Sequence, residues 1–220
     1  AYCITEPEAG TDVSGIRTTA TRDGDGWVLN GGKIWIHNAP VADLGFVLAR
    51  TDKEAGNRGM SIFIVDLHAA GVERGPKEHK MGQRASQVGA LNFQDVKLGA
   101  DALLGQENRG FHMMMSVLDK GRVGIAALAV GIGQAGLEAA VDYAGQRKQF
   151  GKTIAEFQGV QWLLADMAKD IEAARLLVHN AATRIDRGLD ATKYCSMAKC
   201  FAGDMAVART ADAVQVFGGS

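Results

Sequence analysis

Proline is confined to the first 76 residues of the chain, and this distribution constrains the fold more than any other feature of the sequence. The three prolines are Pro7, Pro40 and Pro76, and residues 77–220 contain none. A proline inside a helix costs about 3 kcal/mol, so a long segment without proline favours long helices. The sequence therefore predicts two regions of different structure.

The first region, to about residue 103, has the pattern of β-strands. Short runs rich in β-branched and aromatic residues are separated by Gly, Asp and Asn, and they lie at 27–29, 33–36, 45–50, 60–67 and 90–98. Asn30-Gly31-Gly32, between the first two runs, is typical of a tight hairpin turn in which both central residues need a positive φ. No helical period links the runs, so we expect an antiparallel β-barrel.

The second region has the period of helices. Near one face of the first expected helix are Phe111, Met114, Leu118, Ile125, Leu128, Ile132 and Tyr143. The second has a stripe with alternating steps of four and three, namely Val160, Leu164, Met167, Ile171, Ala174, Val178, Ala181 and Ile185. Gly188 would stop it, Asp190 would cap the third helix, and that helix would carry Met197, Phe201, Met205, Ala208 and Val214. The fold class is therefore α+β, a barrel followed by an antiparallel α-helical bundle.

Composition argues against several kinds of function. A formal net charge of −1 gives no basic field for nucleic acid and no polybasic signal for a membrane surface. The most apolar run, Val123–Gly133, is about half of the roughly 20 residues that a membrane span needs. The three cysteines form no CxxC and the five histidines form no HxxxH, so we expect reduced thiols and no metal site.

The segment Gly131–Gly136 matches the GxGxxG pattern of dinucleotide-binding proteins. That pattern needs a preceding strand and a βαβ unit, whereas the residues before it are rich in alanine and continue the helical period from Phe111. We therefore interpret these small residues as a place where two helices approach closely.

The segment Tyr2–Asp12 has the composition of a ligand-binding loop. A short apolar run ends in a Pro/Gly turn that carries two hydroxyls, those of Thr5 and Thr11. Gly10 would let a ligand approach the backbone, and amides together with the Thr11 hydroxyl suit phosphate oxygens. A capped loop without a ligand is the plainer interpretation of the segment alone. Trp35 would either stack on a planar ligand or fill a core.

Eight segments together resemble the acyl-CoA dehydrogenase family in their order and spacing. They are TEPEAGTD, NGGKIWI, KMGQRAS, LDKGRV, QRKQFG, FQ, KCFAGD and QVFGG, and they extend over nearly the whole chain. The resemblance implies the family's middle β-barrel domain at 1–103, its C-terminal helical bundle at 104–220, and FAD as cofactor. It also implies an acyl-CoA substrate, an electron-transferring flavoprotein as partner, a homo-oligomer (tetramer or dimer), and a location in the bacterial cytoplasm or, less favoured, the mitochondrial matrix.

The resemblance implies flavin-binding residues in three places. The first set is Tyr2, Ile4, Thr5, Gly10, Thr11, Trp35, Ile36 and His37. The second, acting partly across a subunit interface, is Arg147, Lys148, Gln149, Phe150, Phe157 and Gln158, and the third, at a neighbour's adenylate, is Gln215, Gly218 and Gly219. The implied acyl-CoA contacts are Thr11, Ser86, Leu118, Asp119 and Arg122. Plainer interpretations stay open, with Arg147 as a solvated helix-end charge and Asp119–Arg122 as a surface ion pair.

The sequence departs from the family pattern at two positions. The family usually has Thr or Ser at the position of His37, where the hydroxyl bonds to the flavin N5 region. A histidine still donates, but it is larger and titrates at about pH 6.5. The usual catalytic glutamate is expected beyond Ser220, and the position that a minority of relatives use is occupied by Gly121. We therefore expect no catalytic base within residues 1–220.

The expected reaction is FAD-dependent α,β-dehydrogenation of an acyl-CoA to the trans-2-enoyl-CoA, in β-oxidation or amino-acid catabolism. A carboxylate removes the pro-R α-proton while the β-hydrogen leaves as hydride to flavin N5. The chain begins at AYCITEPEAG without Met and ends at VFGGS, so we expect an inactive piece of a longer enzyme. Two alternatives stay open: an acyl-CoA oxidase that uses oxygen, and a non-catalytic interaction module on the same fold.

Overall fold

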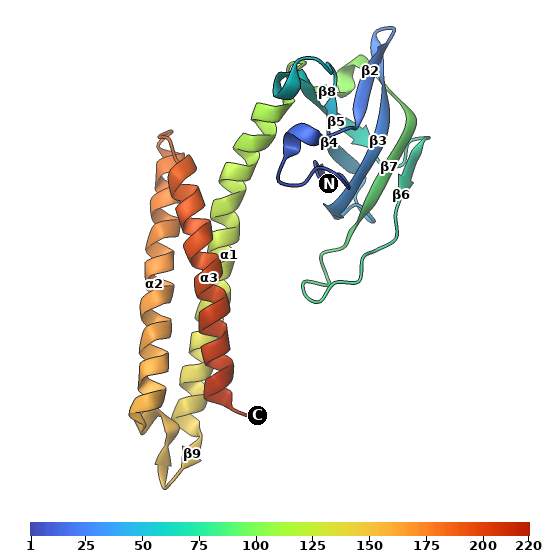
Figure 1. Ribbon diagram of the computed structural model, residues 1–220. Coiled ribbons are helices and arrows are strands. Elements are labelled where there is room, and N and C mark those ends of the chain that lie inside the picture. Colours follow the sequence, from blue (N-terminus) through green and yellow to red (C-terminus); the bar gives the residue numbers. More distant parts are fainter. The chain divides into compact units, whose positions relative to one another are not determined.

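The computed structural model places eight strands of the first half of the chain in one sheet (Figure 1). They are β1 (Tyr2–Cys3), β2 (Thr19–Asp23), β3 (Gly26–His37), β4 (Leu44–Arg50), β5 (Met60–Asp66), β6 (Val72–Arg74), β7 (Val88–Leu98) and β8 (Leu103–Leu104). Their order across the sheet is β6-β7-β3-β2-β4-β5-β8, with β1 beside β4. The structure describes all residues 1–220, which divide into two units, Ala1–Met115 and Ser116–Ser220.

The predicted β domain followed by a helical domain is confirmed, and the sheet itself is mixed. Most neighbouring strands are antiparallel, as predicted, but β1 pairs in parallel with β4, and so does the first residue of β2. The core of the sheet includes Trp27 and Phe63, whose rings meet edge to face with centroids 5.1 Å apart. The predicted domain boundary at residue 103 stays a prediction.

The predicted hairpin at Asn30-Gly31-Gly32 is wrong. These residues lie inside β3, which runs through them as one strand whose register against β7 shifts twice, once with the extra residue on β7 and once with it on β3. The glycine is needed for another reason: Gly31 has a φ of 142°, and a Cβ there would lie 2.5 Å from Oγ1 of Thr18. The hairpin turn lies earlier, at Gly24-Asp25 between β2 and β3, where Gly24 has a φ of 62°.

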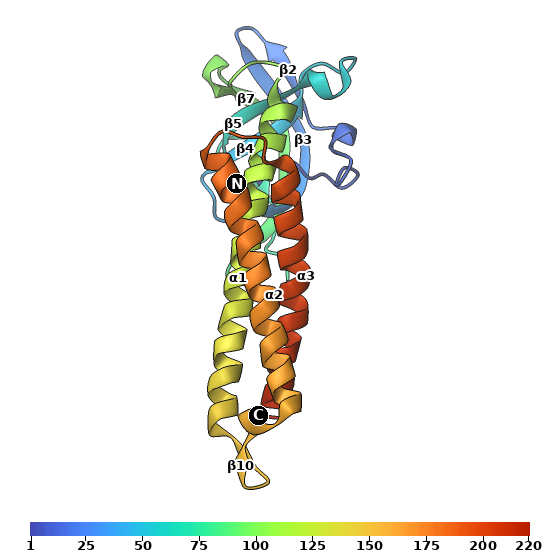
Figure 2. The ribbon, with the colours of Figure 1, turned by 90° about the vertical axis from the view of Figure 1, so that its left-hand side faces the viewer.

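Three long helices make up most of the rest of the chain: α1 (Gly110–Gln146), α2 (Gln158–Asp186) and α3 (Thr192–Phe217). Figures 1 and 2 both show α2 and α3 beside the later part of α1, with the chain reversing direction at each connection. Gly188, with a φ of 66°, follows the end of α2 as predicted. The Asp190 carboxylate accepts a hydrogen bond from the backbone N of Thr192 at 3.1 Å, at the start of α3.

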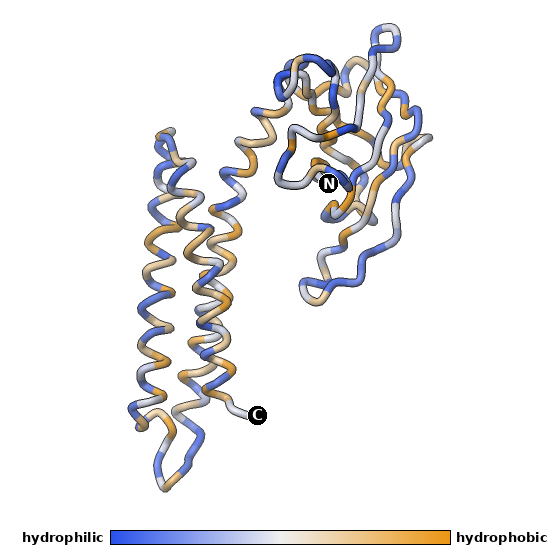
Figure 3. The backbone as a smooth tube through the Cα atoms, in the orientation of Figure 1, coloured by the Kyte–Doolittle hydropathy of each residue, from blue (hydrophilic) through white to orange (hydrophobic).

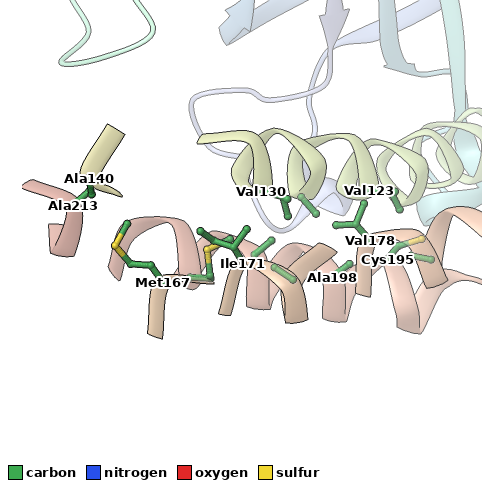
Figure 4. Close-up of a cluster of buried hydrophobic side chains, with 14 of the residues drawn as sticks. Val123, Val130, Ala140, Met167, Ile171, Val178, Cys195, Ala198 and Ala213 are labelled. Carbon is green, nitrogen blue, oxygen red and sulfur yellow. The ribbon is translucent and has the colours of Figure 1, made fainter. Parts of the chain in front are cut away.

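The core stripe predicted for α2 is confirmed. Five of its eight members are buried, namely Met167, Ile171, Ala174, Val178 and Ala181, and the other three are partly buried against the same cluster. Figure 4 shows Met167, Ile171 and Val178 in this cluster with Val123 and Val130 of α1 and Cys195 and Ala198 of α3. The helical unit therefore has a core of its own.

The faces predicted for α1 and α3 are partly wrong. On α1, Ile125, Leu128 and Ile132 are about half exposed, whereas the bundle core takes Val123, Ala126, Val130, Ala140 and Ala144. On α3, Met205 is buried as predicted, but Met197, Phe201, Ala208 and Val214 are exposed, and Cys195, Ala198, Ala202, Ala213 and Val216 face inward. Figure 3 shows apolar residues along much of α1. Where a helix is apolar on several faces, the small residues mark the side on which helices pack closely.

By length and composition alone, α1 could cross a membrane, which the sequence pattern did not predict. The prediction counted only the continuous run Val123–Gly133, whereas the whole helix is longer and poor in charge. A core helix of a folded domain meets the same criteria, and α1 buries Val123, Ala126 and Val130 in the bundle.

The packing interpretation of Gly131–Gly136 is confirmed. The segment lies in the middle of α1, and the residues before it belong to the same helix. A Cβ at Gly133 would lie 3.1 Å from Sδ of Met205 and 3.2 Å from Cγ1 of Ile171, whereas a Cβ at Gly131 would meet nothing within 4 Å. The first glycine is open to solvent, and the second is where α2 and α3 approach α1.

We expect Gly131→Ala and Gly133→Ala to have different effects on stability. Alanine in place of glycine inside a helix stabilises by about 0.5–1 kcal/mol, so Gly131→Ala is expected to raise the free energy of unfolding. Gly133→Ala gains the same helix propensity, but its Cβ presses on Met205 and Ile171. We therefore expect its free energy of unfolding to lie about 1 kcal/mol or more below that of Gly131→Ala. Urea denaturation of both variants measures the difference, and equal effects would contradict close packing at Gly133.

Candidate functional site

The tip of the N-terminal loop is open to solvent. Gly10 and Thr11 are exposed, and a Cβ at Gly10 would meet nothing within 4 Å, so packing inside the protein does not require glycine there. Thr5 is half-buried beside β3, where its carbonyl oxygen accepts a hydrogen bond from N of Ile34 at 2.9 Å. The loop thus lies on β3 and leaves its backbone at Gly10 free for a ligand.

The side chains of Tyr2 and Ile4 are used mainly inside the protein. The Tyr2 hydroxyl donates to the carbonyl oxygen of Met114 at 2.8 Å, and burial raises the pKa of Tyr2 to about 12. Ile4 is buried in the same apolar cluster as Met114. If Tyr2 and Ile4 contact a flavin as predicted, they do so mainly through their backbone N–H and C=O groups.

Trp35 does not fill the core. Its side chain is 59% exposed, whereas Trp27 is 2% exposed and occupies the core of the sheet. Trp35 also has a φ of 58°, at one of the bulges of β3. For a bulky residue this conformation costs about 1–3 kcal/mol, and such strain clusters at ligand-binding sites. An exposed indole held in this way is suited to stack on a planar ligand.

His37 and Ser86 lie together at the end of β3. Nδ1 of His37 is 3.0 Å from Oγ of Ser86, and N of Asn38 donates to O of Gln87 at 2.6 Å. His37 is exposed, while the side chain of Ile36 is buried, so Ile36 offers a ligand only its backbone. The sequence predicted one member of the His37–Ser86 pair for the flavin and the other for CoA, and did not predict their contact.

Asp119 and Arg122 form an ion pair on α1. Oδ2 of Asp119 also accepts a hydrogen bond from Oγ1 of Thr192 at 3.1 Å, which ties α1 to the start of α3. A cavity of about 380 Å³ lies here, and its lining includes Asp119, Thr192 and Cys195. Asp119 thus lines a hollow between helices, while its partner Arg122 remains partly exposed. Leu118, beside it, is partly exposed.

The connection between α1 and α2 is a short hairpin of β9 (Lys148–Gln149) and β10 (Lys152–Thr153) with an apolar tip. Phe150 and Gly151 have φ values of 54° and 81°, the pattern of a type I′ turn, and Phe150 is 93% exposed. The Phe150 ring meets that of Phe157 edge to face with centroids 6.1 Å apart. Arg147, Lys148, Gln149 and Gln158 are also exposed.

The end of α3 lies beside this hairpin. Tyr143 of α1 stacks on Phe217 of α3 with ring centroids 4.6 Å apart, and its hydroxyl is 2.9 Å from Oγ of Ser220. Gly218, with a φ of 69°, ends the helix, and both Gln215 and Gly219 are exposed. The structure thus brings the second and third predicted flavin sets to one end of the bundle, as Figures 1 and 2 show.

The two ends of the bundle are far apart. The part of α1 from Asp119 to Gln146 measures roughly 40 Å at about 1.5 Å per residue. Residues at the two ends therefore do not contact the same small molecule within one chain.

Two family models match the chain in consecutive segments. "Acyl-CoA dehydrogenase, middle domain" matches residues 1–96, and "Acyl-CoA dehydrogenase, C-terminal domain" matches residues 108–220. The chain belongs to the acyl-CoA dehydrogenase family. This confirms the resemblance seen in its eight sequence segments.

Individual relatives agree with this assignment. The chain is 46% identical over 219 residues to the caffeyl-CoA reductase-Etf complex subunit CarC of Acetobacterium woodii, covering 100% of the chain and 58% of that protein. The structure of butyryl-CoA dehydrogenase from Megasphaera elsdenii is 48% identical with a TM-score of 0.97, covering 100% of the chain and 57% of that one. A structure described as PigA with FAD and proline is 32% identical with a TM-score of 0.96 and the same coverage. The chain thus spans less than three-fifths of each relative.

Within this acyl-CoA dehydrogenase domain pair, sequence reasoning missed Lys33. Its side chain is fully buried, and Nζ lies 2.8 Å from Oε1 of Glu6, which is 6% exposed. Burial lowers the pKa of Lys33. Burial alone would raise the pKa of Glu6, but the Lys33 charge and hydrogen bonds, including one from N of Arg17, hold it below its ordinary value. The alternation of buried Trp27 and Leu29 along β3 would have predicted that Lys33 points inward.

Proposed function

We propose that the protein containing this chain is an FAD-dependent acyl-CoA dehydrogenase. It would convert an acyl-CoA to the trans-2-enoyl-CoA and pass the electrons to an electron-transferring flavoprotein. The observation that carries the proposal is the exposed, conformationally strained Trp35 beside the open N-terminal loop, in a chain of this family. The butyryl-CoA dehydrogenase and the Etf-complex subunit among its relatives support the substrate class and the partner.

FAD fits the residues of the sheet unit. Trp35 offers an aromatic face for the isoalloxazine, and the hydroxyl of Thr11 with the uncovered backbone at Gly10 suits phosphate oxygens. Thr5 and His37 offer hydrogen bonds close by. When bound, the flavin supplies the acceptor for the hydride, and the protein orients the substrate and excludes water.

The exposed residues at the far end of the bundle would serve the FAD of a neighbouring copy. Arg147, Gln149 and Gln215 are exposed at that end of the bundle, and the length of α1 separates it from Asp119 by roughly 40 Å. An arginine fork suits a pyrophosphate because it donates two parallel hydrogen bonds. Asp119, which lines the hollow, and its partner Arg122 would instead hold the CoA part of the substrate. The proposal therefore includes a homo-oligomer.

The choice of electron acceptor tests the proposed function. With an acyl-CoA series in air, we expect enoyl-CoA formation only when an electron-transferring flavoprotein is added, because a dehydrogenase holds its reduced flavin away from oxygen. Enoyl-CoA would be measured by chromatography and hydrogen peroxide by a coupled assay. Rapid turnover with peroxide and no added acceptor would contradict the dehydrogenase and support the oxidase. Flavin without turnover on any acyl-CoA would support the non-catalytic module.

A further inference from the structure

One carboxylate closes the base of the N-terminal loop. Oε2 of Glu6 accepts a hydrogen bond from N of Arg17 at 2.6 Å, and Oε1 accepts one from N of Thr18 at 3.1 Å. Nζ of Lys33 donates to the same Oε1 at 2.8 Å. Three donors, from the returning end of the loop and from β3, therefore meet at one side chain.

Lys33 joins this base to the sheet. Besides Glu6, its Nζ donates to the carbonyl oxygen of Ile4 at 2.9 Å. The next residue on the strand, Ile34, donates its backbone N to the carbonyl oxygen of Thr5 at 2.9 Å. Two consecutive residues of β3 thus hold three consecutive residues of the loop, from Ile4 to Glu6.

A second attachment holds the loop beyond its tip. Nη2 of Arg50, at the end of β4, donates to O of Ser14 at 2.7 Å, and its Nε donates to O of Ile16 at 3.3 Å. The exposed residues Gly10 and Thr11 lie between the two attachments. Their place in space depends on both.

Stability alone does not account for the buried pair. Replacing a buried ion pair by apolar side chains of similar volume is often neutral or stabilising, because both charges lose their hydration. An apolar side chain at Glu6, however, accepts nothing from the amides of Arg17 and Thr18. What the carboxylate adds is a fixed geometry, since its two oxygens accept several hydrogen bonds in set directions.

We propose that Glu6 and Lys33 are positioning residues that set the loop conformation in which Thr5 and Thr11 meet FAD. The proposal rests on the function proposed above. Both side chains are buried, so neither touches the ligand, and they act through the loop backbone. The predicted consequence is that flavin affinity depends on the pair more than fold stability does.

The test uses the full-length protein with Glu6→Met and Lys33→Met combined. We expect it to fold, and its dissociation constant for FAD, measured by fluorescence quenching, to rise about tenfold or more. Glu6→Gln with Lys33→Met keeps one acceptor oxygen and is expected to recover part of the affinity. The control is Val96→Ala, a buried core change on β7 opposite Leu29 rather than Lys33. It should lower stability and leave FAD affinity within about twofold.

A readout without flavin keeps this test separate from the proposed function. Hydrogen exchange at the amides of Arg17, Thr18 and Ile34 is expected to be about tenfold faster or more in the double methionine variant, and unchanged in Val96→Ala. If the wild type binds no FAD, the proposed function fails, and the exchange data still test the loop. Unchanged exchange, unchanged FAD affinity, or an equal loss of affinity in Val96→Ala would each overturn the proposal.

Discussion

Lys33→Met alone is expected to lower the free energy of unfolding by about 3–5 kcal/mol, because it leaves the Glu6 carboxylate buried without its counter-charge. The matched control is Lys97→Met. Lys97 lies 2.7 Å from Asp23, nearly the same separation as the 2.8 Å in the buried pair, but its side chain is 69% exposed. An exposed pair contributes about 0–1 kcal/mol. Urea denaturation of both variants measures the contrast, and similar losses would contradict the account of the buried pair.

The same pair predicts a loss of stability in acid. The pKa of Glu6 is lower in the folded protein than its ordinary value of 4.5, because the Lys33 charge and the hydrogen bonds outweigh burial. Such a group contributes stability that is fully present above its unfolded pKa and is lost as pH falls through its folded pKa. We therefore expect wild-type stability to fall more steeply below pH 4.5 than that of Glu6→Gln. Parallel curves of unfolding free energy against pH for the two proteins would contradict this.

Gly121→Glu is expected to create a catalytic base. The carboxylates of the N-terminal loop are already engaged: Glu6 with Lys33, Glu8 with Arg17, and Asp12 with N of Ser14. We propose that the resident base is a glutamate elsewhere in the full-length protein. A Cβ at Gly121 would meet nothing within 4 Å, so the position accepts a side chain without a clash at Cβ.

The clean setting for this prediction is the full-length protein with its own catalytic glutamate changed to glutamine. Adding Gly121→Glu is expected to raise the rate of flavin reduction by acyl-CoA about 10²–10⁴-fold, the usual contribution of a positioned base. Gly121→Gln has nearly the same shape without the charge and serves as the control. No gain with glutamate, or an equal gain with glutamine, would contradict the assignment of this position. Rates would come from anaerobic stopped-flow absorbance.

The part of the fold that the sequence predicted best is the part with a single apolar face. The α2 stripe from Val160 to Ile185 lies among polar residues, so its period identifies one inward side. On α1 and α3, apolar residues occupy several faces, and a periodicity does not tell which of them packs. Ile125 and Met197 were therefore predicted on a packed face, where alanines lie instead.

The candidate site was predicted residue by residue, but its internal contacts were not. Composition alone predicts only a turn near Gly10 and an aromatic residue at Trp35. The segments TEPEAGTD and NGGKIWI, through their resemblance to the family, identified both as candidate ligand contacts. That Trp35 is exposed with a positive φ depends on a bulge, which pairing with β7 produces. The contacts of Glu6 with Lys33 and of His37 with Ser86 join residues 27 and 49 positions apart. Local sequence patterns do not predict contacts between residues so far apart in the chain.

The measurement that tests the central claim most directly is anaerobic titration of the purified full-length protein with butyryl-CoA. We predict that FAD co-purifies with the protein and that its absorbance at about 450 nm falls on adding substrate, because the flavin accepts the hydride. Free CoA should leave the spectrum unreduced. Absence of bound flavin, or flavin that no acyl-CoA of any chain length reduces, would contradict the assignment of this chain to an acyl-CoA-oxidising flavoenzyme.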